Sequence, residues 1–318
     1  MTLKSIKNAA VMRILSSLPR GVRRKIVNDA IARKSISYKQ LCEIAKNFNV
    51  VAFSVKGDYG VIQNTTEDRV MTPYYAETGH WGALVKSLLS DYFGPAGGTY
   101  FDVGANIGLT TIPIATNPKV TCISLEPSPQ NFAYLQKNVA ANCPNGNVHA
   151  KQIAAFDKPS TLEFELNPEN TGDNRIRLGT DIDLMGEGKW RTVSIQALPL
   201  DEIAGTVTMP IAVKIDVQGA EPFVVKGGRK TLASAGLLIL EFSPYSMARM
   251  GADPEEIFQC LQNDFAVMNY VIGEDGKPDA TVSAAEGVAQ LREMAAKHVD
   301  NIYFWVDVIA RKPQAKAS

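Results

Sequence analysis

Three charged residues interrupt an apolar run that otherwise predicts a buried strand. The stretch VKIDVQGAEPF, Val213 to Phe223, carries Lys214, Asp216 and Glu221. Buried charges cost several kcal/mol unless they are paired or used. At a ligand site, Asp216 can take a proton from a hydroxyl group while Lys214, on the same face of the strand, holds the carboxylate ionised. Alternatively, Asp216 caps the helix expected near Ala220 and pairs with Lys214, and the two roles are compatible.

A glycine-rich turn, FDVGANIG, lies between a predicted strand and a predicted helix. Such a turn lets backbone N–H groups approach a ligand at the positive end of the helix. Asn106 and Leu109 stand where a dinucleotide fingerprint needs its second and third glycines, so the turn does not suit a pyrophosphate. A carboxylate before the first glycine suits a cation such as an ammonium group. We therefore expect a nucleoside ligand with an amino-acid end and no phosphate, bound by Asp102, Gly104, Ala105, Asn106 and Gly108.

A second acidic position lies 18 residues after Gly108, in SLEPSPQNF. Glu126 ends the next predicted strand, where a carboxylate can accept both ribose hydroxyls. The alternative role, a helix-capping carboxylate, is weakened because Ser128 and Pro129 already supply a cap. Together the two motifs predict S-adenosylmethionine, with Pro127 beside the ribose carboxylate. The stretch IAAFD is expected to end the third strand, with Ala154 and Ala155 against the adenine.

Short apolar strands alternate with helical stretches from Thr99 onward, which predicts a parallel sheet covered on both faces. The strand before Asp216 is then the fourth, next to the first strand, at the point where ligands bind in doubly wound sheets. Residues 157–198 break the alternation and predict antiparallel strands around a polar loop. We place a domain boundary near residue 98, between an extension of helices and a β-hairpin (1–98) and a cofactor-binding domain (99–318).

Composition limits the class of protein. The 318 residues are 45% hydrophobic and 21% charged, with a formal net charge of +0. These values are typical of a globular protein with a full core and give no indication of nucleic-acid binding. No apolar run reaches the length of a membrane span. The four cysteines form no CxxC pair, which predicts reduced thiols and a cytoplasmic location.

The first 34 residues are strongly basic, with nine Lys or Arg side chains and one acid, Asp29. Apolar residues recur there at helical spacing, so the segment can form an amphipathic helix. Three interpretations stay open: a helix docked on the body, a weak contact with a membrane surface or another anionic partner, and a cleaved transit peptide.

The motifs FDVGANIG, LEPSPQNF and VKIDVQGAEPFVVKGG, followed by LLILEF, resemble the FkbM-type family of S-adenosylmethionine-dependent methyltransferases. The resemblance runs from about residue 50 to 310. It implies an α/β, Rossmann-like class I methyltransferase fold with a mostly parallel seven-stranded sheet and helices on both faces. It also implies methylation of hydroxyl groups on small molecules, notably sugars and natural products. The family often has Glu at the position of Gln218, although Gln is also met there. It often has an acidic residue at the position of Gly82, and this second departure leaves the contribution of the amino-terminal helix to the site open.

A hydroxyl acceptor must lose its proton, and Asp216 is the first candidate base, with Lys214 orienting it. His80 is the second candidate, whereas His149 and His298 look unrelated to the site. No cluster has metal-ligand spacing, so we expect no metal. Three residues of the 157–198 region, Trp190, Asn170 and Asn174, can contact the acceptor.

Two other classes are weighed against the enzyme. One is a non-catalytic module that binds S-adenosylmethionine and is held on a membrane or complex by its basic amino terminus. The other is a dehydrogenase, which Asn106 and Leu109 disfavour. A cavity enclosed by residues 157–198 and the first helices favours the enzyme, and an open, flat site favours the module. Neither the acceptor nor the oligomeric state follows from the sequence.

Overall fold

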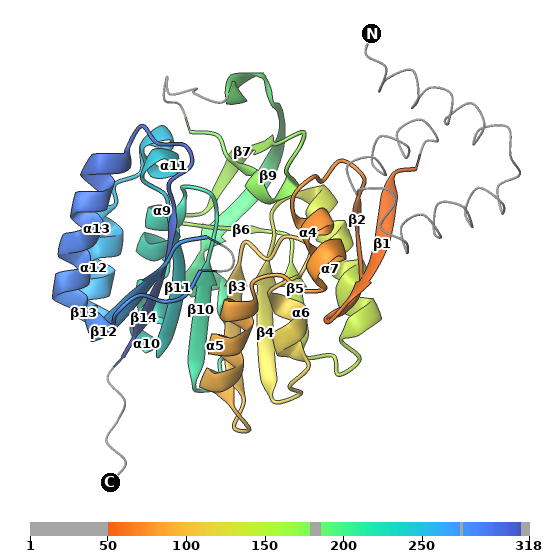
Figure 1. Ribbon diagram of the computed structural model, residues 1–318, viewed down its shortest axis with the longest axis horizontal. Helices are drawn as coiled ribbons and strands as arrows, with labels where there is room; N and C mark the ends of the chain where they lie inside the picture. Colours follow the sequence, from red (N-terminus) through yellow and green to blue (C-terminus); the bar gives the residue numbers. More distant parts are fainter. Residues whose placement is uncertain (1–49, 179–185, 274–275, 313–318) are drawn as a thin grey trace, which may run out of the picture.

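A computed structural model describes residues 50–178, 186–273 and 276–312, so the predictions for residues 1–34 lie outside the described residues. Its central sheet has eight strands in the order β13-β12-β14-β11-β10-β3-β4-β5 (Figure 1). The strands are β3 (Gly98–Val103), β4 (Val120–Leu125), β5 (Val148–Lys151), β10 (Ile211–Ile215), β11 (Leu237–Phe242), β12 (Val267–Val271), β13 (Val282–Ser283) and β14 (Val306–Arg311).

The neighbouring strands β5, β4, β3, β10 and β11 pair in parallel. Strand β14 runs antiparallel to both of its neighbours, β11 and β12. The order reverses between β3 and β10, which makes their carboxyl ends the switch point of a doubly wound sheet. The predicted Rossmann-like fold is confirmed. The predicted strand number is wrong by one, because the two-residue strand β13 adds itself antiparallel to the edge strand β12.

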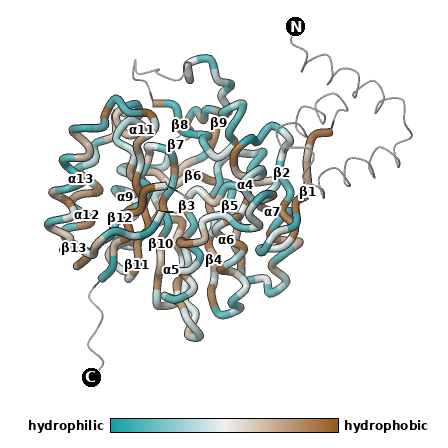
Figure 2. The backbone as a smooth tube through the Cα atoms, in the orientation of Figure 1, coloured by the Kyte–Doolittle hydropathy of each residue, from teal (hydrophilic) through white to brown (hydrophobic). Residues whose placement is uncertain are grey.

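Successive side chains of a strand point to opposite faces of the sheet. Because the buried strands are apolar on both faces, helices cover both. Phe101, Val213 and Leu238 belong to one core cluster, and the residues beside them, Tyr100 and Ala212, belong to the other. The apolar strands at the centre of the molecule stand out in Figure 2. The covering helices are α5 (Ala83–Phe93), α6 (Thr111–Ala115), α7 (Pro129–Asn142), α9 (Glu221–Gly227), α10 (Arg229–Ser234), α12 (Glu255–Asp264) and α13 (Ala284–His298).

The 157–198 region belongs to a second, four-stranded sheet of order β6-β9-β7-β8. It comprises β6 (Ala154–Phe156), β7 (Ser160–Leu166), β8 (Arg175–Ile176) and β9 (Arg191–Pro199), with the 3₁₀ helices η1 (Thr171–Asp173) and η2 (Glu187–Lys189), and α8 (Leu200–Ile203) follows it. The predicted antiparallel pairing of STLEFEL with RTVSIQA is confirmed, as β7 with β9.

One prediction for this region is wrong. The stretch IAAFD does not end the third strand, which stops at Lys151. Ala154–Phe156 instead pairs with Ala197–Pro199 in the second sheet, and Phe156 stacks on Phe223 with ring centroids 4.7 Å apart. The buried pair between Arg249, in α11 (Pro244–Arg249), and Glu165 ties this sheet to the body of the protein.

The residues before β3 pack directly on the central sheet. The strands β1 (Ala52–Gly57) and β2 (Gly60–Thr65) form the predicted hairpin, and Asn138 and Asn142 of α7 hydrogen-bond the backbone of β2. The side chains of Tyr75, in α4 (Met71–Thr78), and Phe93 share a core cluster with Tyr100. The domain boundary near residue 98 stays a prediction, and residues 71–81 also reach the cavity described below.

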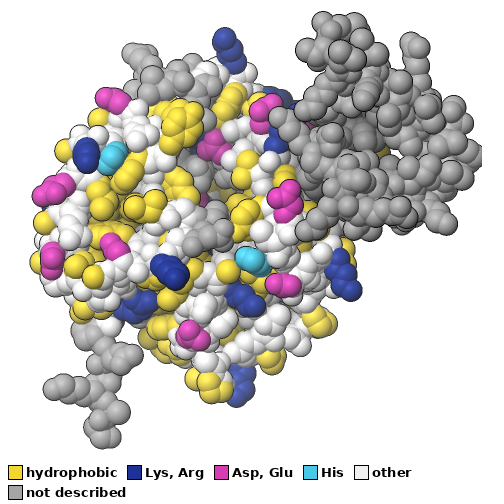
Figure 3. Space-filling model, viewed as in Figure 1, with side chains coloured by type: hydrophobic (Ala, Val, Ile, Leu, Met, Phe, Trp, Pro, Cys, Tyr) yellow, Lys and Arg dark blue, Asp and Glu magenta, His cyan; other side chains and the backbone are white. Residues whose placement is uncertain are grey.

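Two further sequence predictions concern the environment of the protein. None of the described helices combines the length and the hydropathy that a membrane span requires. Cys122, Cys143 and Cys260 are buried free thiols, and burial raises the pKa of Cys143 to about 11. On the face in Figure 3, acidic and basic side chains of the described residues are interspersed rather than sorted by sign.

Candidate active site

A cavity of about 460 Å³ opens at the carboxyl ends of β3, β10 and β11. This volume falls within the range of small-molecule sites. Walls come from the glycine turn, from residues around α4, from the second sheet and from the segment before β14. Eleven of the residues predicted from sequence line the cavity, namely Lys214, Asp216, Gly104, Ala105, Asn106, Glu126, Pro127, Ala154, Ala155, Asn170 and Asn174. Asp102, Gly108 and His80 are not among its lining residues.

The glycine turn brings the ends of β3 and β10 together. Gly104 has φ +86°, and a Cβ there would lie 1.9 Å from the carbonyl oxygen of Asp216. Only glycine fits this approach, which places the glycine turn and Asp216 side by side at the switch point. Asn106 also has a left-handed backbone, with φ 51°, which Asn adopts more readily than most residues.

Glu126 is a buried carboxylate in the cavity wall. Its Oε2 accepts from the backbone N–H of Asn106 at 2.9 Å, and its Oε1 accepts from that of Ser128 at 2.8 Å. Burial raises the pKa of Glu126 to about 7, although both backbone donors oppose this shift. Each oxygen keeps a second lone pair, so the carboxylate can still accept from two hydroxyl groups. Ser128 caps α7 as predicted, so Glu126 is not needed for that role.

Asp102 lies beneath the glycine turn instead of in the cavity. Its Oδ2 accepts from the hydroxyls of Thr110 at 2.7 Å and Thr111 at 2.6 Å. Its Oδ1 has no hydrogen-bond partner among the described residues, and the contact with the ammonium group of the ligand that the sequence predicts stays a prediction. The carboxylate also positions Thr110, which does line the cavity. Gly108 likewise supports the turn from behind, against Leu135 and Ile112.

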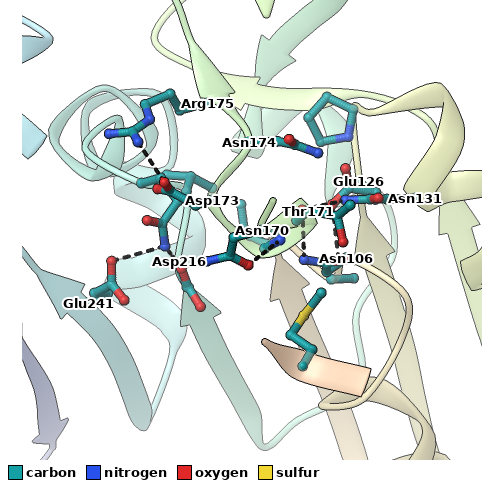
Figure 4. Close-up of a pocket in the computed structure, with 18 of the residues that line it drawn as sticks. Asn106, Glu126, Asn131, Asn170, Thr171, Asp173, Asn174, Arg175, Asp216 and Glu241 are labelled. Carbon is teal, nitrogen blue, oxygen red and sulfur yellow. Dashed lines mark hydrogen bonds and ion pairs between the residues drawn. The ribbon is translucent and has the colours of Figure 1, made fainter. Parts of the chain in front are cut away.

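A network of charges surrounds Asp216. The Lys214 ammonium lies 2.9 Å from Oδ2 of Asp216. The Gln218 amide donates to Oδ1 of Asp216 at 2.8 Å and to Oε1 of Glu241 at 3.1 Å, so one side chain bridges two carboxylates. Figure 4 shows Asp216 and Glu241 at one end of the cavity and Glu126 at the other.

The alternative reading, in which Asp216 caps the next helix, is wrong. The N-cap residue of α9 is Ala220, which receives no side-chain cap, and the Glu221 carboxylate closes the preceding turn by accepting from the backbone N–H groups of Val217 and Gly219. The ion pair of Asp216 with Lys214 is confirmed. Asp216 is therefore left to face the cavity, with its side chain 34% exposed.

Carboxyl groups outnumber ammonium groups around Asp216. Burial works against the ammonium of Lys214, but Asp216 and Asp102 outweigh it and raise the Lys214 pKa. Burial, followed by the charge of Asp216, raises the pKa of Glu241 well above its usual range and that of Asp307 to about 6. A neutral or proton-releasing group suits this end better than an anion does.

His80 is not part of this site. It lies in a separate shallow depression beside Asp58 and Lys86. Its ring meets that of Tyr74 edge to face, with centroids 6.1 Å apart, and Tyr74 in turn lines the cavity. His80 thus borders on Tyr74 and Trp81, which line the cavity, but it does not line the cavity with Asp216. His149 is exposed, and His298 stacks on Phe304.

Several residues that line the cavity are not predicted from the sequence. Glu241 ends β11 in LLILEF, where the same end-of-strand signal that identified Asp216 could have found it. Arg175 is 2% exposed, pairs with Asp173 at 2.7 Å and has its guanidinium 4.9 Å from the centre of the Trp190 ring. Asn170 and Asn174 line the cavity as predicted, whereas Trp190 supports Arg175 from behind. Aromatic side chains at Tyr74, Trp81, Tyr245 and Trp305 complete the wall.

No metal-binding group of three or more His, Cys, Asp or Glu side chains occurs within residues 50–178, 186–273 and 276–312. The glycine turn, Glu126 and the surroundings of Asp216 fit the predicted cofactor, S-adenosylmethionine. The glycine turn leaves space for a close backbone approach, and Glu126 presents acceptors for a pair of hydroxyl groups. The acidic end near Asp216 suits a ligand that carries a positive charge there.

Comparisons with known proteins agree with this assignment. Residues 102–271 match the model of the methyltransferase FkbM domain. The hexuronic acid methyltransferase AglP of Haloferax volcanii is 27% identical over 164 residues, which cover 51% of this chain and 60% of AglP.

Solved structures are more distant. Methyltransferase FkbM from Methylobacillus flagellatus is 15% identical, with a TM-score of 0.40, over 67% of this chain and 43% of its own. A methyltransferase from Agrobacterium tumefaciens is 10% identical, with a TM-score of 0.42, over 83% and 71%. The fold assignment depends on the strand order and not on these likenesses. Because the family match covers more than half of the 318 residues, from the glycine turn past Glu126 and Asp216, the chain belongs to the FkbM family of methyltransferases, and S-adenosylmethionine is its cofactor.

Proposed function

We propose that this protein transfers the methyl group of S-adenosylmethionine to a hydroxyl group of a sugar or a similarly hydroxylated small molecule. The observation that carries the proposal is the carboxylate of Asp216, which faces the cavity while Lys214 and Gln218 each bind one of its oxygens. A carboxylate acceptor would be repelled there, whereas a hydroxyl acceptor finds a group that can take its proton.

The lining of the cavity supports a sugar as the acceptor. Amide side chains of Asn170, Asn174 and Gln218 can hydrogen-bond hydroxyl groups, and the aromatic rings of Trp81 and Trp305 offer flat apolar surfaces. AglP is named a hexuronic acid methyltransferase, which is a further indication that sugars are acceptors in related proteins.

Each residue around Asp216 has a distinct role in this proposal. S-adenosylmethionine supplies an already activated methyl group, so the protein mainly aligns the acceptor and receives its proton. Asp216 takes the proton, directly or through a water molecule. Lys214 and Gln218 each hold one of its oxygens and thereby fix its orientation. Glu241 replaces His80 as the second candidate base, because it shares the Gln218 amide and lines the cavity.

A panel of acceptors tests the proposal. The protein is incubated with methyl-labelled S-adenosylmethionine and with neutral sugars, uronic acids, amines and hydroxylated natural products, and the products are analysed by mass spectrometry. We expect the label as a methyl ether on a hydroxyl group. A methyl ester or a methylated amine as the main product would contradict the proposed acceptor. Cofactor binding without transfer to any acceptor would favour the non-catalytic module, which the cavity enclosed by η1 and α4 disfavours.

A further inference from the structure

Two large hydrophobic side chains beside the cavity are exposed to solvent. Among the described residues, Tyr303 is 85% exposed and Ile272 is 69% exposed. Tyr303 stands in the chain between Ile302 and Trp305, which both line the cavity. Single exposed apolar side chains need no explanation, whereas apolar side chains gathered at the mouth of a ligand cavity indicate a contact surface. Ile272, Ile302, Tyr303 and Trp305 are called the apolar rim below.

Strand register places the apolar rim at the end of the cavity that contains the candidate bases. In β14, Asp307 pairs with Glu241 near the carboxyl end of β11, and on its other side with Val271, the last residue of β12. Trp305 comes shortly before Asp307 in the chain. Ile272 directly follows Val271, so both rim residues lie at the edge where β11 ends. The rim therefore begins where the acceptor is expected.

The turn that carries Tyr303 is held by hydrogen bonds. The Asn301 side chain accepts from the backbone N–H of Tyr303 at 3.0 Å, and the Asn301 carbonyl accepts from that of Phe304 at 3.1 Å. The Phe304 ring stacks on His298 of α13, with ring centroids 3.7 Å apart. Because the residues on both sides of Tyr303 are held in place, a defined turn presents its ring to solvent.

The size of the rim selects among the partners that an apolar surface can take. A stable protein interface buries roughly 800 Å² per partner, far more than two exposed side chains can offer. A small apolar group needs only such a surface, and tyrosine offers it a flat ring. Trp305 continues the surface into the cavity, where a sugar ring can lie. A molecule with a sugar at one end and an apolar group at the other fits both parts.

We propose that the acceptor is a glycoside whose apolar aglycone lies on the apolar rim, while its sugar ring reaches Asp216 through the mouth of the cavity. This inference rests on the proposed methyl transfer to a sugar hydroxyl and names the class of molecule that carries the sugar. Trp305 faces the sugar ring, and Tyr303 and Ile272 contact the aglycone. The rim thus sets the affinity for the acceptor and leaves the chemical step to Asp216.

Binding of alkyl glucosides tests the rim without methyl transfer. The probes are methyl β-D-glucoside and octyl β-D-glucoside below its micelle concentration, which share the sugar and differ in the aglycone. Calorimetry measures their affinity for the protein saturated with S-adenosylhomocysteine. The rim variant combines Ile272→Ser with Tyr303→Ser. The matched control combines Val51→Ser with Val61→Ser, which removes exposed apolar side chains that do not line the cavity.

Octyl glucoside should bind the wild type about tenfold more tightly than methyl glucoside, because part of its alkyl chain leaves water. The rim variant should reduce this ratio to within about twofold, and the control variant should keep it. Equal affinities for the two glucosides in the wild type, or an unchanged ratio in the rim variant, would overturn the proposal. A dimer or a vesicle-bound form that the two serines abolish would assign the rim to a second copy or a lipid surface and overturn it as well.

Transfer assays with the same two glucosides separate this inference from the proposed function. Methyl transfer to both glucosides with the same KM would support the proposed function and overturn the role of the rim. Tighter binding of octyl glucoside that the rim variant loses, with transfer to no acceptor of the panel, would support the rim and contradict the proposed reaction.

Discussion

The ammonium of Lys214 and the carboxylate of Asp216 lie 2.9 Å apart at the end of β10, the ammonium buried and the carboxylate facing the cavity. The Lys214 side chain is 10% exposed and the Asp216 side chain 34%. This asymmetry explains the charges in VKIDVQGAEPF. The buried ammonium of Lys214 compensates the carboxylates around it. Glu221 closes the turn before α9, and the Asp216 carboxylate stays accessible to a ligand in the cavity.

Replacing Lys214 by Met should destabilise the protein, because Asp216, Glu241 and Asp307 lose the ammonium among them. We expect a loss of about 1–3 kcal/mol in the free energy of unfolding, less than for a fully buried pair because Asp216 is partly exposed. Urea unfolding at neutral pH measures it. The control is Lys226→Met, which removes a more exposed ammonium 3.7 Å from Asp157. Equal losses in both variants would contradict this account of Lys214.

Asp307 should make the protein less stable as the pH rises. Burial, followed by the charge of Asp216, raises its folded-state pKa from 3.8 to about 6, while Lys214 opposes the shift. The folded state then holds the proton that the unfolded state loses, so stability decreases between about pH 4 and pH 6. Asp307→Asn removes this effect and should be more stable than the wild type at pH 8, by on the order of 1–2 kcal/mol. At pH 3 the two proteins should differ little. The exposed Asp300→Asn is the control, and an Asp307→Asn gain that does not depend on pH would refute the interpretation.

Glu126 should bind the ribose of the cofactor as a carboxylate. Glu126→Gln keeps one acceptor oxygen but removes the charge and should weaken binding of S-adenosylhomocysteine by about 1.5–3 kcal/mol. Because burial raises the Glu126 pKa to about 7, wild-type affinity should also decrease as the pH falls below 7, and the variant should lack this dependence. Calorimetry at pH 6 and pH 8 measures both. Equal affinities for wild type and variant at both pH values, or tight binding of NAD, would exclude the assigned role.

The basic segment 1–34 should be separable from the cofactor site. A variant that begins after residue 34 should bind S-adenosylhomocysteine with unchanged affinity. If the segment contacts a membrane surface, the full chain should sediment with anionic vesicles at low salt and detach as salt screens the attraction. Neutral vesicles are the control. A full chain that stays in solution with anionic vesicles at every salt concentration would leave the docking and transit-peptide interpretations.

Local patterns in the sequence predict much of the fold and part of the site. The parallel strands were predictable because short apolar runs alternate with capped helices, as at Ser128 and Pro129. Gly104, Glu126 and Asp216 were predictable because each ends a strand at the same edge of the sheet.

Contacts between distant segments explain what the sequence did not reveal. The bridge from Gln218 to Glu241 and the bonds of Asn106 and Asn131 to Thr171 join residues 23 to 65 positions apart. No local period encodes such pairs. His80 was misplaced for the same reason, since its neighbour Trp81 lines the cavity while His80 faces the depression beside Asp58.

The central claim, that Asp216 takes the proton of a hydroxyl acceptor, is tested most directly by the turnover of Asp216→Asn. The substitution keeps the shape and the hydrogen-bonding positions of the side chain but removes its basicity. Methyl transfer to the sugar acceptor identified in the panel should fall by roughly 10²–10⁴-fold, while affinity for S-adenosylhomocysteine stays within a few-fold. Asp157→Asn is the control, because that carboxylate also faces a lysine but does not line the cavity. Turnover of Asp216→Asn close to that of the wild type, with the cofactor bound as tightly, would contradict the claim and make Glu241 the base to test.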